Sequence, residues 1–190
     1  MKITTPKLLI SGCGRSGTKY IAELLKSLGV NASHEVPDPK FDVVIDWHLI
    51  SYNKFYDTPM IHQVRNPLDT ISSATKIYKV SWEIISEKIP IKKSDSVLLK
   101  SMKYYYYWNK LAEEKSLYTY RIENIENEIE KILKLIDIKE YDKSIIESIS
   151  KETNSRKHTD YSWDALKKVD LSLTNKIIEL GKSYGYEIKN

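Results

Sequence analysis

The sequence predicts an α/β fold with three layers, in which a parallel sheet lies between helices on both faces, followed by a helical C-terminal part. Three observations indicate it. Short apolar runs of strand length alternate with segments whose apolar residues recur at helical spacing, as in successive βαβ units. The first apolar run leads into three closely spaced glycines and then into a helical segment. After residue 82 most apolar residues recur at helical spacing.

Length and composition indicate an ordinary globular chain. With 190 residues, 41% hydrophobic and 29% charged, it fits one domain over residues 1–190. Its apolar runs are too short for a membrane span, and its start lacks the apolar region of a signal peptide, so we expect a cytoplasmic protein. One cysteine, Cys13, excludes an internal disulfide and a multi-cysteine zinc site. The net charge of +4 is well mixed, which weakly favours an anionic ligand and gives no support for a nucleic-acid partner.

The first half of the chain supplies most of the strands. A helix follows the first glycine-rich loop and stops at Gly29. A later helix starts with Asn66 as its N-cap and Pro67 at its first position. Strands are predicted over residues 8–10, 30–35, 42–46 and 59–64, with a short helix over 49–56.

The second half is mostly helical. Pro90 ends a helix that includes Trp82, and a long amphipathic helix carries the aromatic run 104–108, which we expect to be core rather than an acceptor-binding wall. Ser162 is the expected N-cap of a late helix. The predicted elements are helices over residues 82–89, 95–114 and 122–136, a strand over 116–121, and two or three short helices at the end, separated by a polar loop at 154–162.

The glycine-rich segment between the first strand and the first helix, residues 12–17, is here named the glycine loop. Such a loop presents backbone N–H groups at a helix N-terminus, where the helix dipole favours an anion. Gly12 and Gly17 have the spacing of the triphosphate motif G-x-x-x-x-G-K-[ST], which predicts a P-loop NTPase-like fold. However, Thr18 stands at the lysine position and Lys19 at the position of the magnesium-binding hydroxyl. With its charge moved to Arg15, the loop is predicted to hold an anion without a metal.

A second group of polar residues follows later strands of the predicted sheet. Arg65 ends the strand over residues 59–64, and Ser73 lies two turns into the next helix. His34 and Glu35 stand at the end of the strand over 30–35. Ligands of open α/β sheets bind outside the carboxyl ends of the strands, so Glu35 is expected to face the same crevice as Arg15.

In this order, the two anion-binding motifs resemble those of sulfotransferases that use 3′-phosphoadenosine 5′-phosphosulfate (PAPS), of the small bacterial or viral type. Residues 12–18 resemble the 5′-phosphosulfate loop of that family, and residues 65–73 resemble its 3′-phosphate motif R-x-P-x-D-x-x-x-S. Residues 120–124 resemble the strand-to-helix segment further along such chains. Residues 154–157 lie where the family often adds a basic contact to the 3′-phosphate.

The resemblance implies a metal-independent, in-line transfer of the sulfuryl group from PAPS to a hydroxyl or amine, leaving adenosine 3′,5′-bisphosphate. It implies that Arg15 stabilises the developing charge and that Tyr20 stacks on adenine. Glu35 is the first choice for the base, because protein-tyrosine sulfotransferases and small bacterial relatives carry a Glu after the first helix. His34 is the second choice, and His48 and Asp46 are the third. The implied donor-binding residues are Gly12, Gly14, Arg15, Ser16, Gly17, Thr18, Lys19, Tyr20, Arg65, Ser73, Arg156 and Lys157.

Two alternatives remain open at this stage. A P-loop kinase or nucleotide hydrolase would use ATP with magnesium, and Thr18 at the lysine position disfavours it. A non-catalytic nucleotide-binding protein would keep the loop without a base. The acceptor, whether a small molecule, a carbohydrate or a peptide, is not identified by any segment, and neither is the oligomeric state.

Overall fold

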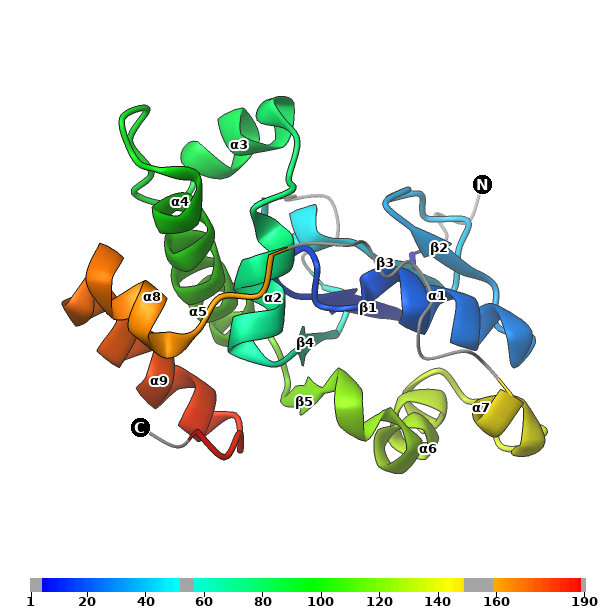
Figure 1. Ribbon diagram of the computed structural model, residues 1–190. Coiled ribbons are helices and arrows are strands. Elements are labelled where there is room, and N and C mark those ends of the chain that lie inside the picture. The colour runs from blue at the N-terminus through cyan, green and yellow to red at the C-terminus, as the bar shows by residue number, and fades with distance from the viewer. Residues whose placement is uncertain (1–4, 52–56, 149–158, 189–190) are drawn as a thin grey trace.

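The computed structural model describes residues 5–51, 57–148 and 159–188 (Figure 1). Its centre is a five-stranded sheet in the order β2-β3-β1-β4-β5, and every strand pair is parallel. The predicted α/β class is therefore confirmed. The strands are β1 (Leu8–Ser11), β2 (Ala32–His34), β3 (Val43–Ile45), β4 (Met60–Val64) and β5 (Thr119–Arg121).

Helices connect the strands and continue after the last one. The early helices are α1 (Thr18–Ser27), α2 (Pro67–Ala74), α3 (Lys79–Ser86), α4 (Val97–Lys103) and α5 (Asn109–Glu114). The later helices are α6 (Ile125–Leu135), α7 (Ser144–Ser148), α8 (Trp163–Val169) and α9 (Leu171–Ser183). The short turns are 3₁₀ helices η1 (Trp47–Ser51) and η3 (Ile122–Asn124) and a π-helical turn η2 (Tyr104–Trp108).

Side chains of the central strand alternate between the two faces of the sheet, as strand geometry requires. Leu8 and Ile10 pack in a core formed with α1, α6 and α7. Leu9 points the other way, into a core formed with η1, α3, η2 and α5. Helices on both faces thus give the predicted three layers, and β1 is buried over its whole length (Figure 1).

The C-terminal helices form a third core rather than covering the sheet. Val64 and Ile71 meet Leu166 and Ile177 there, so α8 and α9 pack on α2 and α4. The Ser162 hydroxyl accepts from the Ala165 amide and caps α8, as the sequence predicts. The helical C-terminal part is therefore confirmed.

Several element boundaries differ from the sequence prediction. The strand expected over residues 116–121 is shorter, Thr119–Arg121, although the Leu117 amide already donates to the Met60 carbonyl at 2.8 Å. The long helix expected over residues 95–114 is continuous from Val97 to Glu114 but contains the π-helical turn η2. The helix expected over 49–56 is a 3₁₀ turn, η1, and its remainder lies outside the described residues. Pro90 ends no regular helix, since α3 already stops at Ser86.

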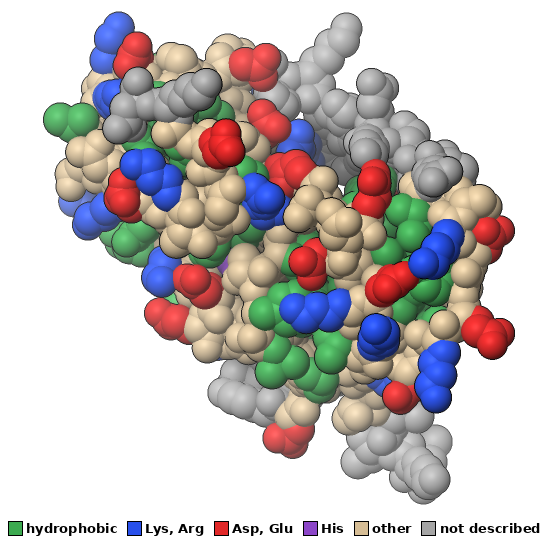
Figure 2. Space-filling view, turned by 90° about the horizontal axis from the view of Figure 1, so that it is seen from below, with side chains coloured by type: hydrophobic (Ala, Val, Ile, Leu, Met, Phe, Trp, Pro, Cys, Tyr) green, Lys and Arg blue, Asp and Glu red, His purple; other side chains and the backbone are tan. Residues whose placement is uncertain are grey.

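Two observations bear on possible partners. No helix in the described ranges is long and apolar enough to cross a membrane. On the face seen in Figure 2, Lys and Arg side chains are interspersed with Asp and Glu side chains. This face therefore offers no continuous basic patch of the kind that nucleic-acid binding requires.

Candidate functional site

The glycine loop joins the end of β1 to the N-terminus of α1 in a tight turn. A Cβ atom on Gly12 would lie 2.1 Å from the carbonyl oxygen of Gln63, so only glycine allows the loop to pass this close to β4. Gly17 is the N-cap of α1 and has φ 92°, a conformation that favours glycine. As a glycine it has no side chain to cap the first amides of the helix. The N-terminus of α1 is thus open to an anion.

The amides of Cys13 and Gly14 in the loop point into the protein. The Cys13 amide donates to Oδ1 of Asn109 at 3.2 Å, and the Gly14 amide donates to the Tyr104 hydroxyl at 2.8 Å. Gly14 is needed for space, since a Cβ there would lie 2.8 Å from the same hydroxyl. The Ser16 amide also has a partner within the loop, the Cys13 carbonyl at 3.2 Å. Anion binding therefore falls to the first amides of α1, and Gly14 contributes close packing rather than a donor.

A second contact holds the loop from the opposite face of the sheet. Nε2 of Gln63 donates to the Ser16 carbonyl at 2.7 Å, and the Tyr120 hydroxyl donates to Oε1 of Gln63 at 2.6 Å. The Ser16 hydroxyl is buried and has no hydrogen-bond partner among the described residues. A buried hydroxyl costs free energy unless it is hydrogen-bonded, so Ser16 is suited to donate to a bound anion.

Arg15 joins the two predicted anion-binding motifs. Its Nε donates to the Ser73 hydroxyl at 2.9 Å, although the residues are 58 positions apart in the sequence. Its φ of 77° is unusual for a residue with a side chain and costs about 1–3 kcal/mol. Backbone strain of this kind persists only where the surrounding structure imposes it. The loop thus directs a guanidinium toward the last turn of α2, where Ser73 lies.

Arg65 stands at the end of β4, where the sequence predicts it. Its Nη2 lies 3.5 Å from Oδ2 of Asp69, and the two side chains are 36% and 53% exposed. Such an exposed pair is weak, and a doubly charged phosphate can replace Asp69 at little cost. Asn66 between them caps α2, with Oδ1 accepting from the amides of Leu68 and Asp69.

The base candidates lie together at the carboxyl ends of β2 and β3, which are neighbours in the sheet. Nε2 of His34 lies 3.1 Å from Oγ1 of Thr18 and 3.9 Å from Oε1 of Glu35. Burial lowers the pKa of His34, and the Glu35 charge opposes this. Glu35 is exposed and has φ 55°, the second strained position among the predicted site residues.

Asp46 and His48 complete this cluster at the end of β3. The His48 amide donates to Oδ1 of Asp46 at 2.8 Å. Burial, with a contribution from the Glu35 charge, raises the pKa of Asp46 to about 6. Burial lowers the pKa of His48, and the Glu35 charge opposes it. The Glu35 charge thus influences the pKa of His34, Asp46 and His48. The base candidates therefore form one electrostatically coupled group.

The raised pKa of Asp46 predicts a stability difference that depends on pH. In the folded chain the pKa of Asp46 is about 6, above its ordinary value of 3.8. The ionised carboxylate therefore destabilises the fold by its full amount above about pH 6, and this destabilisation is absent below about pH 3.8. Asp46→Asn keeps the acceptor for His48 and is expected to raise the free energy of unfolding by about 3 kcal/mol at alkaline pH. Urea unfolding near pH 8 and near pH 4 measures this. A gain of equal size at both pH values would contradict the assignment.

Two of the predicted donor-binding residues, Lys19 and Tyr20, lie in the first turn of α1. Nζ of Lys19 lies 3.6 Å from Oε1 of Glu23 on the exposed face of α1. Tyr20 is only 7% exposed, because its position in the first turn of α1 faces the sheet core. Its stacking on adenine stays a prediction. Arg156 and Lys157 lie outside the described residues.

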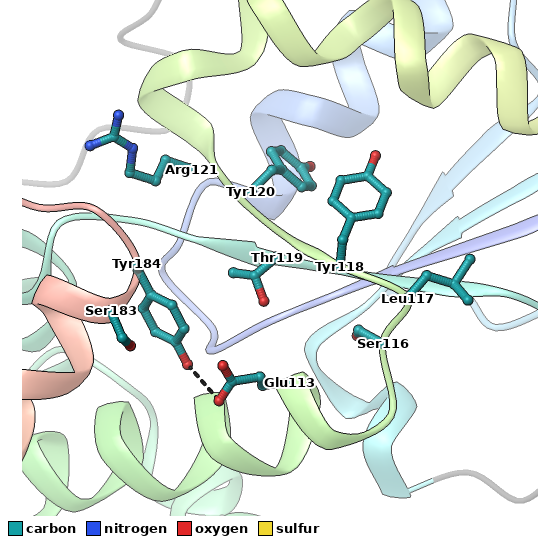
Figure 3. A pocket seen from close by; sticks show the side chains of 9 residues that line it. All are labelled: Glu113, Ser116, Leu117, Tyr118, Thr119, Tyr120, Arg121, Ser183 and Tyr184. Carbon is teal, nitrogen blue, oxygen red and sulfur yellow. Dashed lines mark hydrogen bonds between the residues drawn. The ribbon is translucent and has the colours of Figure 1, made fainter.

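A separate pocket of about 410 Å³ lies along the edge strand β5, between the ends of α5 and α9 (Figure 3). It is mainly polar, and in it the Tyr184 hydroxyl donates to Oε2 of Glu113 at 3.5 Å. Thr119 faces this pocket from β5. None of its lining residues belongs to the glycine loop, so it is not the anion site. Within the described ranges, no group of three or more His, Cys, Asp or Glu side chains is placed to hold a metal.

Sequence reasoning missed the residues that fix the glycine loop from behind. Asn109 and Gln63 are buried polar side chains that follow an aromatic run and lie in a buried strand, respectively, and Tyr104 belongs to the aromatic run expected to be core. Tyr104 is indeed buried in the core, but its hydroxyl also holds the loop. A buried amide in an apolar stretch was the one available signal, and it does not reveal which loop the amide contacts.

No family model matches the chain, and no curated protein matches it. Among solved structures, the chain is similar to mouse sulfotransferase SULT7A1 complexed with PAP, at 16% sequence identity and a TM-score of 0.46. The similarity covers 85% of this chain and 66% of that one. Because the similarity is this distant, the function has to be inferred from the site itself.

Proposed function

We propose that the protein is a PAPS-dependent sulfotransferase, which transfers a sulfuryl group to a hydroxyl or amine of an acceptor. The observation that carries the proposal is the contact between Arg15 and Ser73, 2.9 Å between Nε and Oγ. It supports one site with two anion-binding parts, the glycine loop and the segment from Arg65 to Ser73 that includes α2. A donor with phosphate at its 3′ position and phosphosulfate at its 5′ position needs both parts.

The described residues suit such a donor. The open N-terminus of α1 and the unpartnered Ser16 hydroxyl would hold the 5′-phosphosulfate. Arg65 would hold the 3′-phosphate by a charge-assisted pair, with the Ser73 hydroxyl beside it. When bound, PAPS supplies an activated sulfuryl group on its 5′-phosphate. Arg156 and Lys157 remain proposed contacts to the 3′-phosphate on the grounds of the sequence alone.

Chemistry at this site would depend on positioning and charge. The acceptor's oxygen or nitrogen forms a bond to sulfur while the bond between sulfur and the bridging phosphate oxygen breaks. Arg15 stabilises the negative charge that develops on the leaving phosphate, and adenosine 3′,5′-bisphosphate departs with the electron pair.

Glu35 would take the proton of the acceptor. It is exposed at the end of β2, whereas His34 is partly buried against Thr18. An acceptor approaching from solvent therefore reaches the Glu35 carboxylate first. Asp46 and His48 lie deeper and would tune the charge at Glu35 rather than contact the acceptor.

The experiment that tests the proposal is a transfer assay. The purified chain is incubated with PAPS and a panel of phenols, alcohols, amines, sugars and tyrosyl peptides, and release of adenosine 3′,5′-bisphosphate is followed by chromatography. We expect release that depends on at least one acceptor class. Phosphate transfer from ATP with magnesium, and no transfer from PAPS to any class, would favour the kinase alternative instead.

A further inference from the structure

The glycine loop is held from behind by two side chains of one helix. The Tyr104 hydroxyl accepts from the Gly14 amide, and Oδ1 of Asn109 accepts from the Cys13 amide. Both residues are buried, at 1% exposure each. Consecutive amides of the loop are thus satisfied by residues five positions apart on the α4–η2–α5 helix.

Five positions is the wrong spacing for an α-helix. At 3.6 residues per turn, residues five apart point about 140° away from each other. In a π-helical turn the hydrogen bonds run from residue i to i+5, so residues five apart lie one above the other. The π-helical turn η2 begins at Tyr104 and ends immediately before Asn109. It therefore places both side chains on the face that meets the loop.

We propose that the π-helical turn η2 is a positioning device for the glycine loop, with Tyr104 and Asn109 as positioning residues. By accepting from the Cys13 and Gly14 amides, they orient the loop so that the first amides of α1 face the anion site. Only the expected effect on donor binding rests on the proposed function. The effect on the loop itself does not.

The hydrogen-bond pattern fixes the orientation of Asn109. A backbone amide can only donate, so the side-chain atom facing Cys13 must be the oxygen. That same oxygen lies 3.1 Å from Nε2 of His62, which must therefore carry a proton. Nδ1 of His62 then accepts from the Thr119 hydroxyl at 3.0 Å. Asn109 is thus held in place by a buried chain of hydrogen bonds that reaches β5.

Both acceptors are uncharged, which matters beside an anion. A carboxylate could accept the same amides but would repel a phosphate bound on the other side of the loop. Burial raises the pKa of the Tyr104 hydroxyl and keeps it protonated. Burial likewise lowers the pKa of His62 to about 4, so the ring behind Asn109 stays neutral at physiological pH. The device fixes the loop without adding charge to it.

Amide hydrogen exchange of the unliganded protein, measured residue by residue by NMR, tests the device. Tyr104→Phe is expected to speed exchange of the Gly14 amide by about fivefold to tenfold while leaving Cys13 unchanged. Asn109→Leu is expected to speed exchange of the Cys13 amide by a similar factor while leaving Gly14 unchanged. Tyr105→Phe is the matched control, because the Tyr105 hydroxyl is also buried in η2 but has no hydrogen-bond partner among the described residues.

Asn109→Asp separates geometry from charge. It keeps the accepting oxygen, so protection of the Cys13 amide should return, but its carboxylate should weaken binding of adenosine 3′,5′-bisphosphate by about tenfold. If the Asn109→Leu variant does not fold, Asn109→Asp still tests the role of Asn109. The proposal is overturned if Tyr104→Phe leaves Gly14 exchange as in the unmodified chain, or if Tyr105→Phe alters the loop equally. If the unmodified chain binds no adenosine 3′,5′-bisphosphate, the proposed function fails while the exchange results still decide the role of η2.

Discussion

Replacing Arg15 with alanine is expected to lower kcat for sulfuryl transfer by about 10²–10³-fold, the loss typical of removing one charge-stabilising donor. Arg15 is held against Ser73 by the glycine loop, in which the φ of Arg15 has the strained value of 77°. Its guanidinium is therefore preorganised and needs no rearrangement as charge develops. The rate of adenosine 3′,5′-bisphosphate release at saturating PAPS and acceptor measures the effect.

The matched control is Lys182→Ala, which removes an exposed positive charge from α9, where it pairs with Glu179. It is expected to leave kcat within about twofold, as for other exposed surface substitutions. A loss in the Lys182 variant equal to that of Arg15→Ala would mean that overall charge, not the position of Arg15, determines the rate. Arg15→Lys should recover part of kcat, because it restores charge without the Nε donor to Ser73.

Replacing Glu35 with glutamine is expected to lower the transfer rate by about 10²–10⁴-fold while leaving affinity for adenosine 3′,5′-bisphosphate unchanged. The amide has nearly the same shape but cannot take a proton. Glu35 lies at the exposed end of β2, next to His34, where an acceptor from solvent arrives. Single-turnover transfer and calorimetric titration of the nucleotide measure the two quantities separately.

Glu87→Gln is the control for Glu35, since Glu87 is exposed just after α3 and belongs to no part of the site. Its transfer rate should equal that of the unmodified chain. Undiminished turnover in Glu35→Gln would remove Glu35 from the role of base. Asp46 and His48, at the neighbouring strand end, would then be the groups to replace next.

The parts of the site that depend on neighbouring residues were predictable from the sequence. Gly17 marks the loop because its local backbone geometry requires glycine, and Asn66 and Pro67 mark the start of α2 because capping is local. Arg15 and Ser73 were predicted to share one site, and the structure places them in contact.

The parts that depend on contacts distant in sequence were not predictable. Asn109 reaches Cys13 over 96 positions and Tyr104 reaches Gly14 over 90, through a π-helical turn that no local pattern indicates. The burial of Tyr20 was not predictable for a similar reason. An aromatic residue in a first helical turn can face solvent or core, and only the packing of α1 on the sheet decides which.

The central claim is that one site holds an anion at the glycine loop and a second anion at Arg65. Calorimetric titration of the chain with adenosine 3′,5′-bisphosphate, with adenosine 5′-monophosphate and with ATP plus magnesium tests it most directly. We predict that removing the 3′-phosphate weakens binding by about tenfold or more, and that Arg65→Ala abolishes this difference. Tighter binding of ATP with magnesium, or equal binding of the two adenosine phosphates by the unmodified chain, would contradict the claim.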